Sequence, residues 1–252
     1  IADKEPVKVR TDLDQEEVAK IFKDYDLLSV PVVDHDGRLV GRITVDDVVD
    51  VLEDEIFEDF YKMAGLNLEE RVLDPPMRSI WMRAPWLLIN LATAFLAASV
   101  VGVFSGTIQK LVVLAVFMPI VAGMGGNAAT QTITIVVRGL ALGEFSLKNA
   151  RWVLLKESLV GVANGLLTGV VAMAVSYIIG VNLMVGVLLF LAMTANLLIA
   201  GLSGAFIPII LKWFKIDPAI SATVFVTTCT DIGGFFSFLG LATVFMKMGL
   251  LR

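Results

Sequence analysis

One acidic side chain stands in the middle of the last apolar run of the sequence. Asp231 lies in Thr227-Thr-Cys-Thr-Asp-Ile-Gly-Gly234, inside the run 218–246. A charge at the centre of a bilayer costs at least about 2.5–3.5 kcal/mol, so such a residue normally faces a water-filled path or a partner. Glu157 and Asp217 are near the ends of their runs, so we interpret Asp231 as the only carboxylate at membrane depth. We favour an ion pathway over the alternative, a protonated carboxyl that only hydrogen-bonds between helices.

A second polar group interrupts the apolar run 110–137 and consists of glycines and neutral oxygen-bearing side chains. The glycines permit close approach and exposed carbonyls. Mg²⁺ prefers oxygen ligands and gives up its waters reluctantly, so one carboxylate per subunit with such oxygens would suit a largely hydrated Mg²⁺. Small-residue helix packing is the alternative explanation. The residues expected to line a path are Gly125, Gly126, Asn127, Thr130, Gln131 and Thr227.

The third feature is a dense acidic segment at 46–63, which we predict to be one long helix. One face of that helix carries carboxylates at spacings of three or four residues, at Asp47, Asp50, Asp54 and Glu58. Like charges at this spacing repel one another. Divalent cations could neutralise them, especially if two such helices meet in a dimer, whereas the alternative is an ordinary solvated face. We therefore predict a sensor of cytosolic Mg²⁺.

The elements that precede this helix have the pattern of a small α/β module. Strand-like runs at 7–10, 28–33 and 39–43 combine with helical patterns in the order β-α-β-β-α. A unit of about 50 residues is small for a core of its own. We expect it to pair with another copy, upstream or in a second subunit. Because the sequence begins with Ile1, we also expect a fragment of a longer protein.

The rest of the chain is predicted to cross a membrane. Five apolar runs are each long enough to cross about 30 Å of hydrocarbon, at 85–107, 110–137, 151–179, 184–212 and 218–246. The predicted fold class is a polytopic α-helical membrane protein with five transmembrane helices per subunit. The predicted domains are the module at 1–52, an acidic connecting helix and linker at 53–84, and a transmembrane pore domain at 85–252. An odd number of spans favours a pore formed by a dimer.

Charge and composition set the orientation and exclude several function classes. Lys and Arg are concentrated on the side of the spans that carries the module, which places the module in the cytoplasm and the spans in the cytoplasmic membrane. The net charge of −5 argues against a nucleic-acid partner. A lone cysteine, Cys229, and a lone histidine, His35, exclude a disulfide framework and a multi-histidine metal site. We find no paired catalytic group and expect no enzymatic activity.

These residues resemble the MgtE family of magnesium channels. The segment 28–47 resembles a cystathionine-β-synthase (CBS) module. The more specific part is Gly125-Gly-Asn-Ala-Ala-Thr-Gln131, with Arg138-Gly-Leu-Ala-Leu-Gly-Glu144, Asp217-Pro-Ala219 and Thr230-Asp-Ile-Gly-Gly234. The resemblance implies a homodimer with the pore on its two-fold axis. It also implies that Asp231 is the Mg²⁺-selecting pore aspartate, and that Asn127 and the pair Gly125–Gly126 line the pore.

The resemblance further implies a gate. The acidic helix is similar to the plug helix of the family, in which Asp47, Asp50, Glu55, Glu58 and Asp59 would belong to cytosolic Mg²⁺ sites that hold the closed state. Members of the family can also bind ATP in the CBS region. Thr130 departs from relatives that carry a second Asn there, so the oxygen set can differ.

The predicted function is a Mg²⁺-selective channel or transporter for magnesium uptake and homeostasis, closed by intracellular Mg²⁺. An ion-coupled carrier for Mg²⁺, Co²⁺ or Mn²⁺ is one alternative. A membrane-anchored CBS nucleotide sensor is the other.

Overall fold

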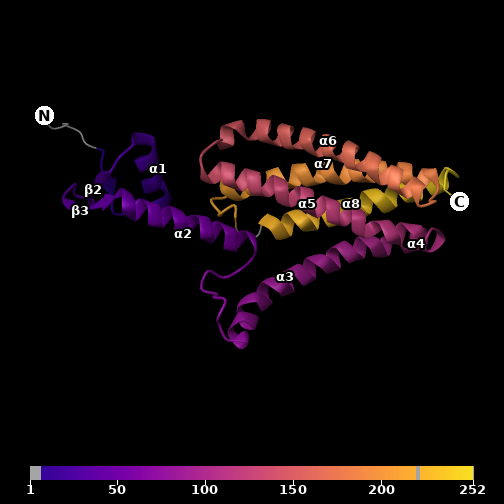
Figure 1. Cartoon of the computed structure of the whole chain (residues 1–252), viewed down its shortest axis with the longest axis horizontal. Coiled ribbons are helices and arrows are strands. Elements are labelled where there is room, and N and C mark those ends of the chain that lie inside the picture. The colour runs from indigo at the N-terminus through magenta and orange to yellow at the C-terminus, as the bar shows by residue number, and fades with distance from the viewer. Residues whose placement is uncertain (1–6, 220–221, 252) are drawn as a thin grey trace. The chain divides into compact units, whose positions relative to one another are not determined.

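The computed structural model describes residues 7–219 and 222–251, and the chain forms two compact units, Ile1–Tyr61 and Lys62–Arg252. The first unit contains a three-stranded sheet in the order β1-β2-β3 (Figure 1). β1 (Val9–Arg10) pairs parallel with β2 (Ser29–Val33), and β2 pairs antiparallel with β3 (Leu39–Thr44). α1 (Gln15–Tyr25) joins β1 to β2, and α2 (Val45–Met63) follows β3. The expected order β-α-β-β-α is present.

The core of this unit is small and lies between α1 and the sheet. Asp14 caps α1 by accepting a hydrogen bond from the backbone N–H of Glu16. The buried apolar side chains of the core are Val9, Val18, Ala19, Phe22, Val30 and Val48. Several large apolar side chains remain exposed, including Leu28 at 77% and Leu39 at 71%. Such exposure is expected of a module that pairs with another domain, and that pairing remains a prediction.

The second unit contains the membrane helices. Among the residues that the structure describes, five helices are long and apolar enough to cross a membrane, which confirms the predicted fold class. Their bounds are α3 (Pro76–Val103), α5 (Val113–Ala141), α6 (Ala150–Ile178), α7 (Leu183–Trp213) and α8 (Ala222–Lys247), with a short α4 (Ser105–Lys110) and a 3₁₀ turn (Leu147–Asn149).

The first membrane helix differs most from its predicted bounds. It begins at Pro76, nine residues before the predicted start of the span at 85, and ends at Val103, where α4 replaces the predicted continuation to 107. Proline suits the first helical turn because its missing N–H has no partner there. The prediction followed the apolar run, whereas the helix also includes polar turns that carry Arg78 and Arg83.

The spans are buried to very different degrees. In the most apolar window of α7, 50% of the residues are buried, whereas the corresponding share for α3 is 6%. α5, α6, α7 and α8 lie side by side, and α3 packs mainly against α8 (Figure 1). α7 is therefore the central helix of the bundle.

Glycines bring α6 and α7 into backbone contact. A Cβ atom added at Gly161, Gly165 or Gly169 would come within 2.4, 2.6 and 2.9 Å, respectively, of backbone atoms of α7. Small residues at four-residue spacing are the usual means by which membrane helices approach closely. These glycines fix α6 against α7.

Candidate functional site

Asp231 is half-buried in α8 and lines a pocket of about 280 Å³. The opposite wall belongs to α3, which contributes Asn90 and Thr93. Thr227 and Thr228, one turn before Asp231 on α8, also face this pocket. The remaining lining residues are Met63, Ala64, Trp86, Ala94, Thr223 and Val224. A single carboxylate thus shares a polar space with neutral amide and hydroxyl groups.

No side chain in the described part of the chain neutralises the charge of this carboxylate. Within residues 7–219 and 222–251, Asp231 has no ion pair and no hydrogen-bond partner. The hydroxyls of Thr227 and Thr228 donate to carbonyls of their own helix, to Thr223 at 3.0 Å and to Val224 at 2.6 Å. Because a hydroxyl oxygen has two lone pairs, these groups can still act as acceptors or ligands. The pocket therefore offers oxygen ligands and a net negative charge, which is the chemistry that hard cations bind.

The polar residues of α5 form a separate exposed stripe. Asn127, Thr130 and Gln131 are exposed, and the hydroxyl of Thr130 donates to the carbonyl of Gly126 at 2.9 Å. Gly125 is buried on the other side of the helix. None of these α5 residues lines the Asp231 pocket, whereas Thr227 does. Exposed amides on a membrane helix are costly against lipid, so this stripe favours contact with water or with another protein surface.

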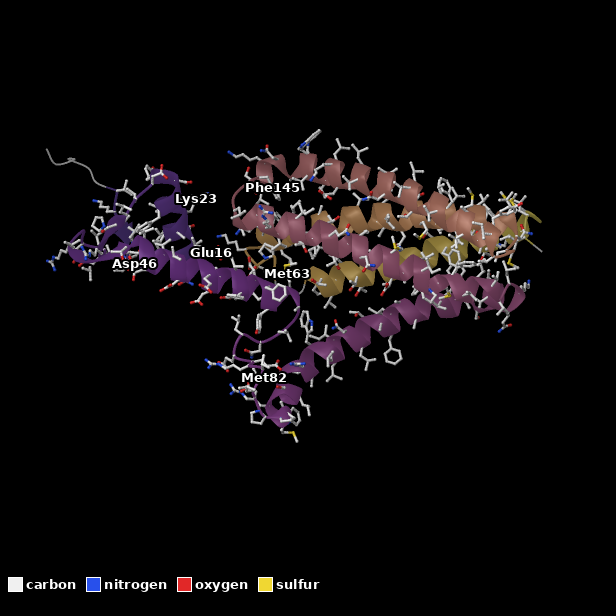
Figure 2. The ribbon with its side chains drawn as sticks, viewed as in Figure 1. Glu16, Lys23, Asp46, Met63, Met82 and Phe145 are labelled. Carbon is white, nitrogen blue, oxygen red and sulfur yellow. The ribbon has the colours of Figure 1, made fainter. Side chains whose placement is uncertain are left out.

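The acidic helix α2 is present, and oxygen-tipped side chains project along it between Asp46 and Met63 (Figure 2). Glu55 accepts a hydrogen bond from the side chain of Gln15 at 2.5 Å, and Asp50 is exposed. Among the described residues, no group of three or more His, Cys, Asp or Glu side chains converges as a metal site. The predicted regulatory residues are therefore not gathered into such a group within the described residues of one chain, and their role as Mg²⁺ ligands stays a prediction; they are Asp47, Asp50, Glu55, Glu58 and Asp59.

Asp47 differs from the other acidic residues of α2 because it caps the helix. Its carboxylate accepts hydrogen bonds from the hydroxyl of Thr44 at 2.6 Å and from the Thr44 backbone N–H at 2.9 Å. These bonds from Thr44, the hydroxyl first, hold the pKa of Asp47 below its ordinary value. Asp47 also lines a pocket of about 420 Å³ in the first unit, together with Arg10 and Thr11. This pocket combines a cation, a hydroxyl and a carboxylate with apolar walls.

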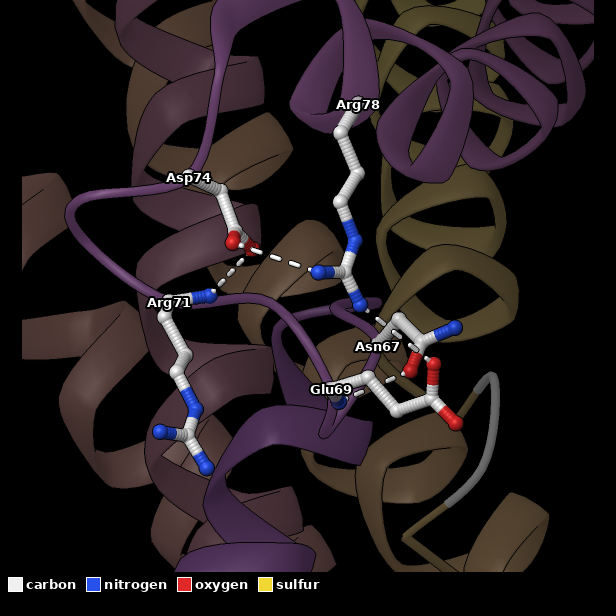
Figure 3. A network of polar contacts seen from close by, with 5 residues as sticks. All are labelled: Asn67, Glu69, Arg71, Asp74 and Arg78. Carbon is white, nitrogen blue, oxygen red and sulfur yellow. Dashed lines mark hydrogen bonds and ion pairs between the residues drawn. The ribbon is translucent and has the colours of Figure 1, made fainter.

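Charge pairs fold the linker between α2 and α3. Arg78 contacts Asp74 at 3.3 Å and Glu69 at 3.7 Å, and Asp74 also accepts the backbone N–H of Arg71 at 2.9 Å (Figure 3). Glu70 is buried and pairs with Arg83 at 2.5 Å. The hydrogen bond from Arg83 lowers the pKa of Glu70.

The start of α8 is linked to the residues that end α2 by one further ion pair. Lys62 contacts Asp217, which precedes α8, at 2.6 Å. Asp217 also accepts the backbone N–H of Ala219 at 2.9 Å, so its carboxylate is held in place. The motif Asp217-Pro-Ala219 therefore has a local structural role.

Glu157 is a second carboxylate inside the bundle, where it is 3% exposed. Its two oxygens contact Thr132 of α5 at 3.4 Å and Lys156 at 2.9 Å. It lies two turns after the start of α6, near the end of that helix, as the sequence predicted. Unlike Asp231, it has partners.

The sequence also missed polar residues that lie within apolar runs. Asn90 and Thr93 were counted as part of the first span, yet they face Asp231. Asn196 in α7 is fully buried. The available signal was the isolated amide in each run, because an amide in a membrane helix needs a polar partner.

The sequence of this chain is similar to those of known transporters and of a known regulatory domain. Residues 118–241 match the family model MgtE, described as a divalent cation transporter, and residues 1–54 match the CBS domain model. The chain is 34% identical over 241 residues to the magnesium transporter MgtE of Enterococcus faecalis, covering 96% of this chain and 53% of that protein. It is 36% identical over 244 residues to the Thermus thermophilus protein of the same name, covering 96% and 54%. For the Bacillus subtilis protein the identity is 35% over 233 residues, covering 92% and 52%. The chain thus spans about half the length of these relatives.

Proposed function

We propose that this chain, which belongs to the MgtE family of divalent cation transporters, provides a path for Mg²⁺ uptake across the cytoplasmic membrane. The observation that carries the proposal is the uncompensated carboxylate of Asp231 in a polar pocket between membrane helices. Relatives named magnesium transporters support the choice of ion. The module is assigned to the cytoplasmic side, in keeping with the distribution of Lys and Arg.

The neutral ligands around Asp231 suit an ion that keeps part of its water shell. Mg²⁺ demands octahedral geometry and dehydrates reluctantly, so a site with one carboxylate and spaced neutral oxygens can bind it through water. Asn90, Thr93 and Thr227 supply such oxygens. A cation with weaker hydration gains less from this arrangement.

A homodimer would complete the path. The exposed amides Asn127 and Gln131 need a polar environment that one chain does not provide. A second copy that meets the first along α5 would bring two such stripes around one aqueous axis, because identical surfaces meet in a two-fold dimer. On this proposal Gly126 and Thr130 also line the path. Gly125 is buried and lies on the opposite side of α5 from the path.

Mg²⁺ flux into proteoliposomes tests the proposal directly. The purified chain is compared with Asp231→Asn, without proton or sodium gradients, and Asp24→Asn on the exposed face of α1 serves as the matched control. We expect flux in the parent and the control and its loss in Asp231→Asn. Equal flux in all three would refute an ion-binding role for Asp231. A flux that requires a counter-ion gradient would favour the coupled carrier.

We assign closure of the path to Mg²⁺ bound at α2. The support is the density of carboxylates on that helix and their mutual repulsion when no cation is bound. On this proposal Mg²⁺ ions bridge Asp50, Glu55, Glu58 and Asp59 to carboxylates of a second copy or of another part of the protein, with water completing the coordination. Low Mg²⁺ would then separate the helices and open the path.

The pocket that contains Arg10 and Asp47 supports a second, regulatory role, the binding of ATP. Arg10 can pair with phosphate, and Asp47 can accept hydrogen bonds from ribose hydroxyls. Calorimetric titration of the detergent-solubilised chain with ATP tests this role. Arg10→Ala should abolish binding, and Arg38→Ala, on the exposed turn before β3, should not. Binding that survives Arg10→Ala would exclude this pocket.

A further inference from the structure

Asn196 stands at the middle of α7 and is fully buried. Its Nδ2 donates a hydrogen bond of 2.7 Å to the backbone carbonyl of Val121 in α5. Its Oδ1 is buried and has no hydrogen-bond partner within the described residues. Burying an amide costs free energy unless its groups are paired, so this side chain is not explained by apolar packing.

Glycines on two other helices make room for the amide. A Cβ atom at Gly125 of α5 would lie 2.2 Å from Nδ2 of Asn196, and one at Gly234 of α8 would lie 2.7 Å from it. From each of these Cβ positions, Oδ1 would be 3.0 Å away. Only hydrogen atoms fit at such distances. The Asn196 amide is therefore wedged between the backbones of α5 and α8.

These glycines belong to the two segments that carry the proposed ion-contacting groups. Gly125 lies two residues before Asn127, and Gly234 lies three residues after Asp231. A change in the size or bonding of the Asn196 side chain is therefore expected to affect both segments.

We infer that Asn196 is a positioning residue, which sets the separation of α5 and α8 and thereby the spacing of Asn127 and Asp231 along the ion path. The inference rests on the proposed transport function. It explains Gly125 and Gly234 as the residues that leave room for this amide. The sequence motifs alone did not indicate that role. Asn196 itself need not touch the ion.

The first test asks whether a smaller side chain at position 196 makes room for a larger one at position 125. Gly125→Ala should clash with the amide and abolish Mg²⁺ flux, and adding Asn196→Ala should restore folding and part of the flux. Gly240→Ala in α8, whose nearest neighbour would be 3.9 Å away, is the control and should behave like the parent. Absence of rescue in the double variant, with the control unaffected, would overturn the wedge.

The second test separates positioning from mere stability. Asn196→Ala should change the ratio of Mg²⁺ to Ca²⁺ flux by about three- to tenfold, the size expected when contacts between neighbouring elements are altered. A purely structural residue would lower the folded fraction and both fluxes equally, leaving the ratio unchanged, and that result would overturn the inference. Hydrogen exchange provides a readout that does not depend on transport, because α5 and α8 should exchange faster in Asn196→Ala.

Different variants test the proposed transport function and the positioning role of Asn196. If Asp231→Asn transports like the parent, the proposed function fails, whatever Asn196 does. If Asp231→Asn is inactive but Asn196→Ala leaves both the flux ratio and the exchange of α5 and α8 unchanged, only the positioning role fails.

Discussion

The carboxylates of this chain occupy two contrasting environments. α2 carries eight acidic residues in 19 positions, mostly exposed to water, whereas α8 carries Asp231 alone in a pocket among membrane helices. A carboxylate exposed to water costs little free energy, and salt screens its charge, so many carboxylates are needed to produce an effect. A carboxylate inside the membrane costs much more free energy and is screened far less. The comparison teaches that a dense surface cluster suits a graded response, and an isolated buried charge suits selection.

The largest expected effect is at Asp231. Removing its charge with Asp231→Asn should reduce Mg²⁺ flux about a hundredfold, because losing one partner of a desolvated charge pair typically costs about 2–5 kcal/mol and a hundredfold corresponds to about 2.7 kcal/mol. The same change should leave thermal stability equal or higher, because a half-buried carboxylate without a partner among the described residues loses its charge. Flux assays and thermal unfolding in detergent test both halves. Loss of flux together with loss of folded protein would contradict the comparison.

The acidic helix should give a smaller, graded effect. Neutralising Asp50, Glu55 and Glu58 together should raise the Mg²⁺ concentration that half-inhibits flux by about tenfold, within the range typical of coupling between sites. Asp46→Asn with Glu53→Gln on the same helix is the matched control, since neither residue belongs to the predicted sites. An equal shift in the control would mean that only the total charge of α2 matters. Unchanged inhibition in the triple variant would refute the sensor.

Asp47 tests whether one acidic residue of α2 has a local structural role. Because the folded-state pKa of Asp47 is lowered, its contribution to stability is present above the ordinary pKa of 3.8 and is lost as the pH falls through the lowered value. Asp47→Asn should therefore increase hydrogen exchange in the first turn of α2 at pH 7. The difference from the parent should vanish below that range. A difference that persists in strong acid would exclude the Thr44 cap as its cause.

The smallest effects are expected in the linker. Glu70→Gln should make the segment between α2 and α3 more sensitive to protease, since the ion pair between the buried Glu70 carboxylate and Arg83 is lost. Glu69→Gln should have no measurable effect, because the contact with Arg78 is 3.7 Å long and exposed. Equal cleavage rates in the two variants would show that burial does not distinguish these pairs.

The sequence predicted the elements better than the contacts between them. Alternation and apolar length located the strands and the five spans, because those signals depend only on neighbouring residues. The helix that contains the first predicted span begins nine residues before that span, because its polar first turns, which include Arg83, look like a loop when only hydropathy is considered. Helix ends in water depend on capping more than on apolar content.

The candidate site was predicted only in part. Asp231 stands out in any hydropathy profile, and the structure places it in a polar pocket. Asn90 and Asn196 do not stand out, because one amide hardly changes the mean hydropathy of a span, and the sequence does not show which helix faces it. The burial of Glu157 could not be predicted for a related reason, since it depends on α7 lying against α6. Roles that depend on a neighbouring helix required the structure.

The glycine contacts between α6 and α7 have a mechanical consequence. The backbones of the two helices are in contact at three successive turns, so the helices cannot slide or tilt against each other without a steric clash. They therefore behave as one rigid unit. α5 and α8 also pack against α7, whereas α3 packs mainly against α8 and is the least buried span. α3 is therefore the membrane helix that can shift with the fewest lost contacts.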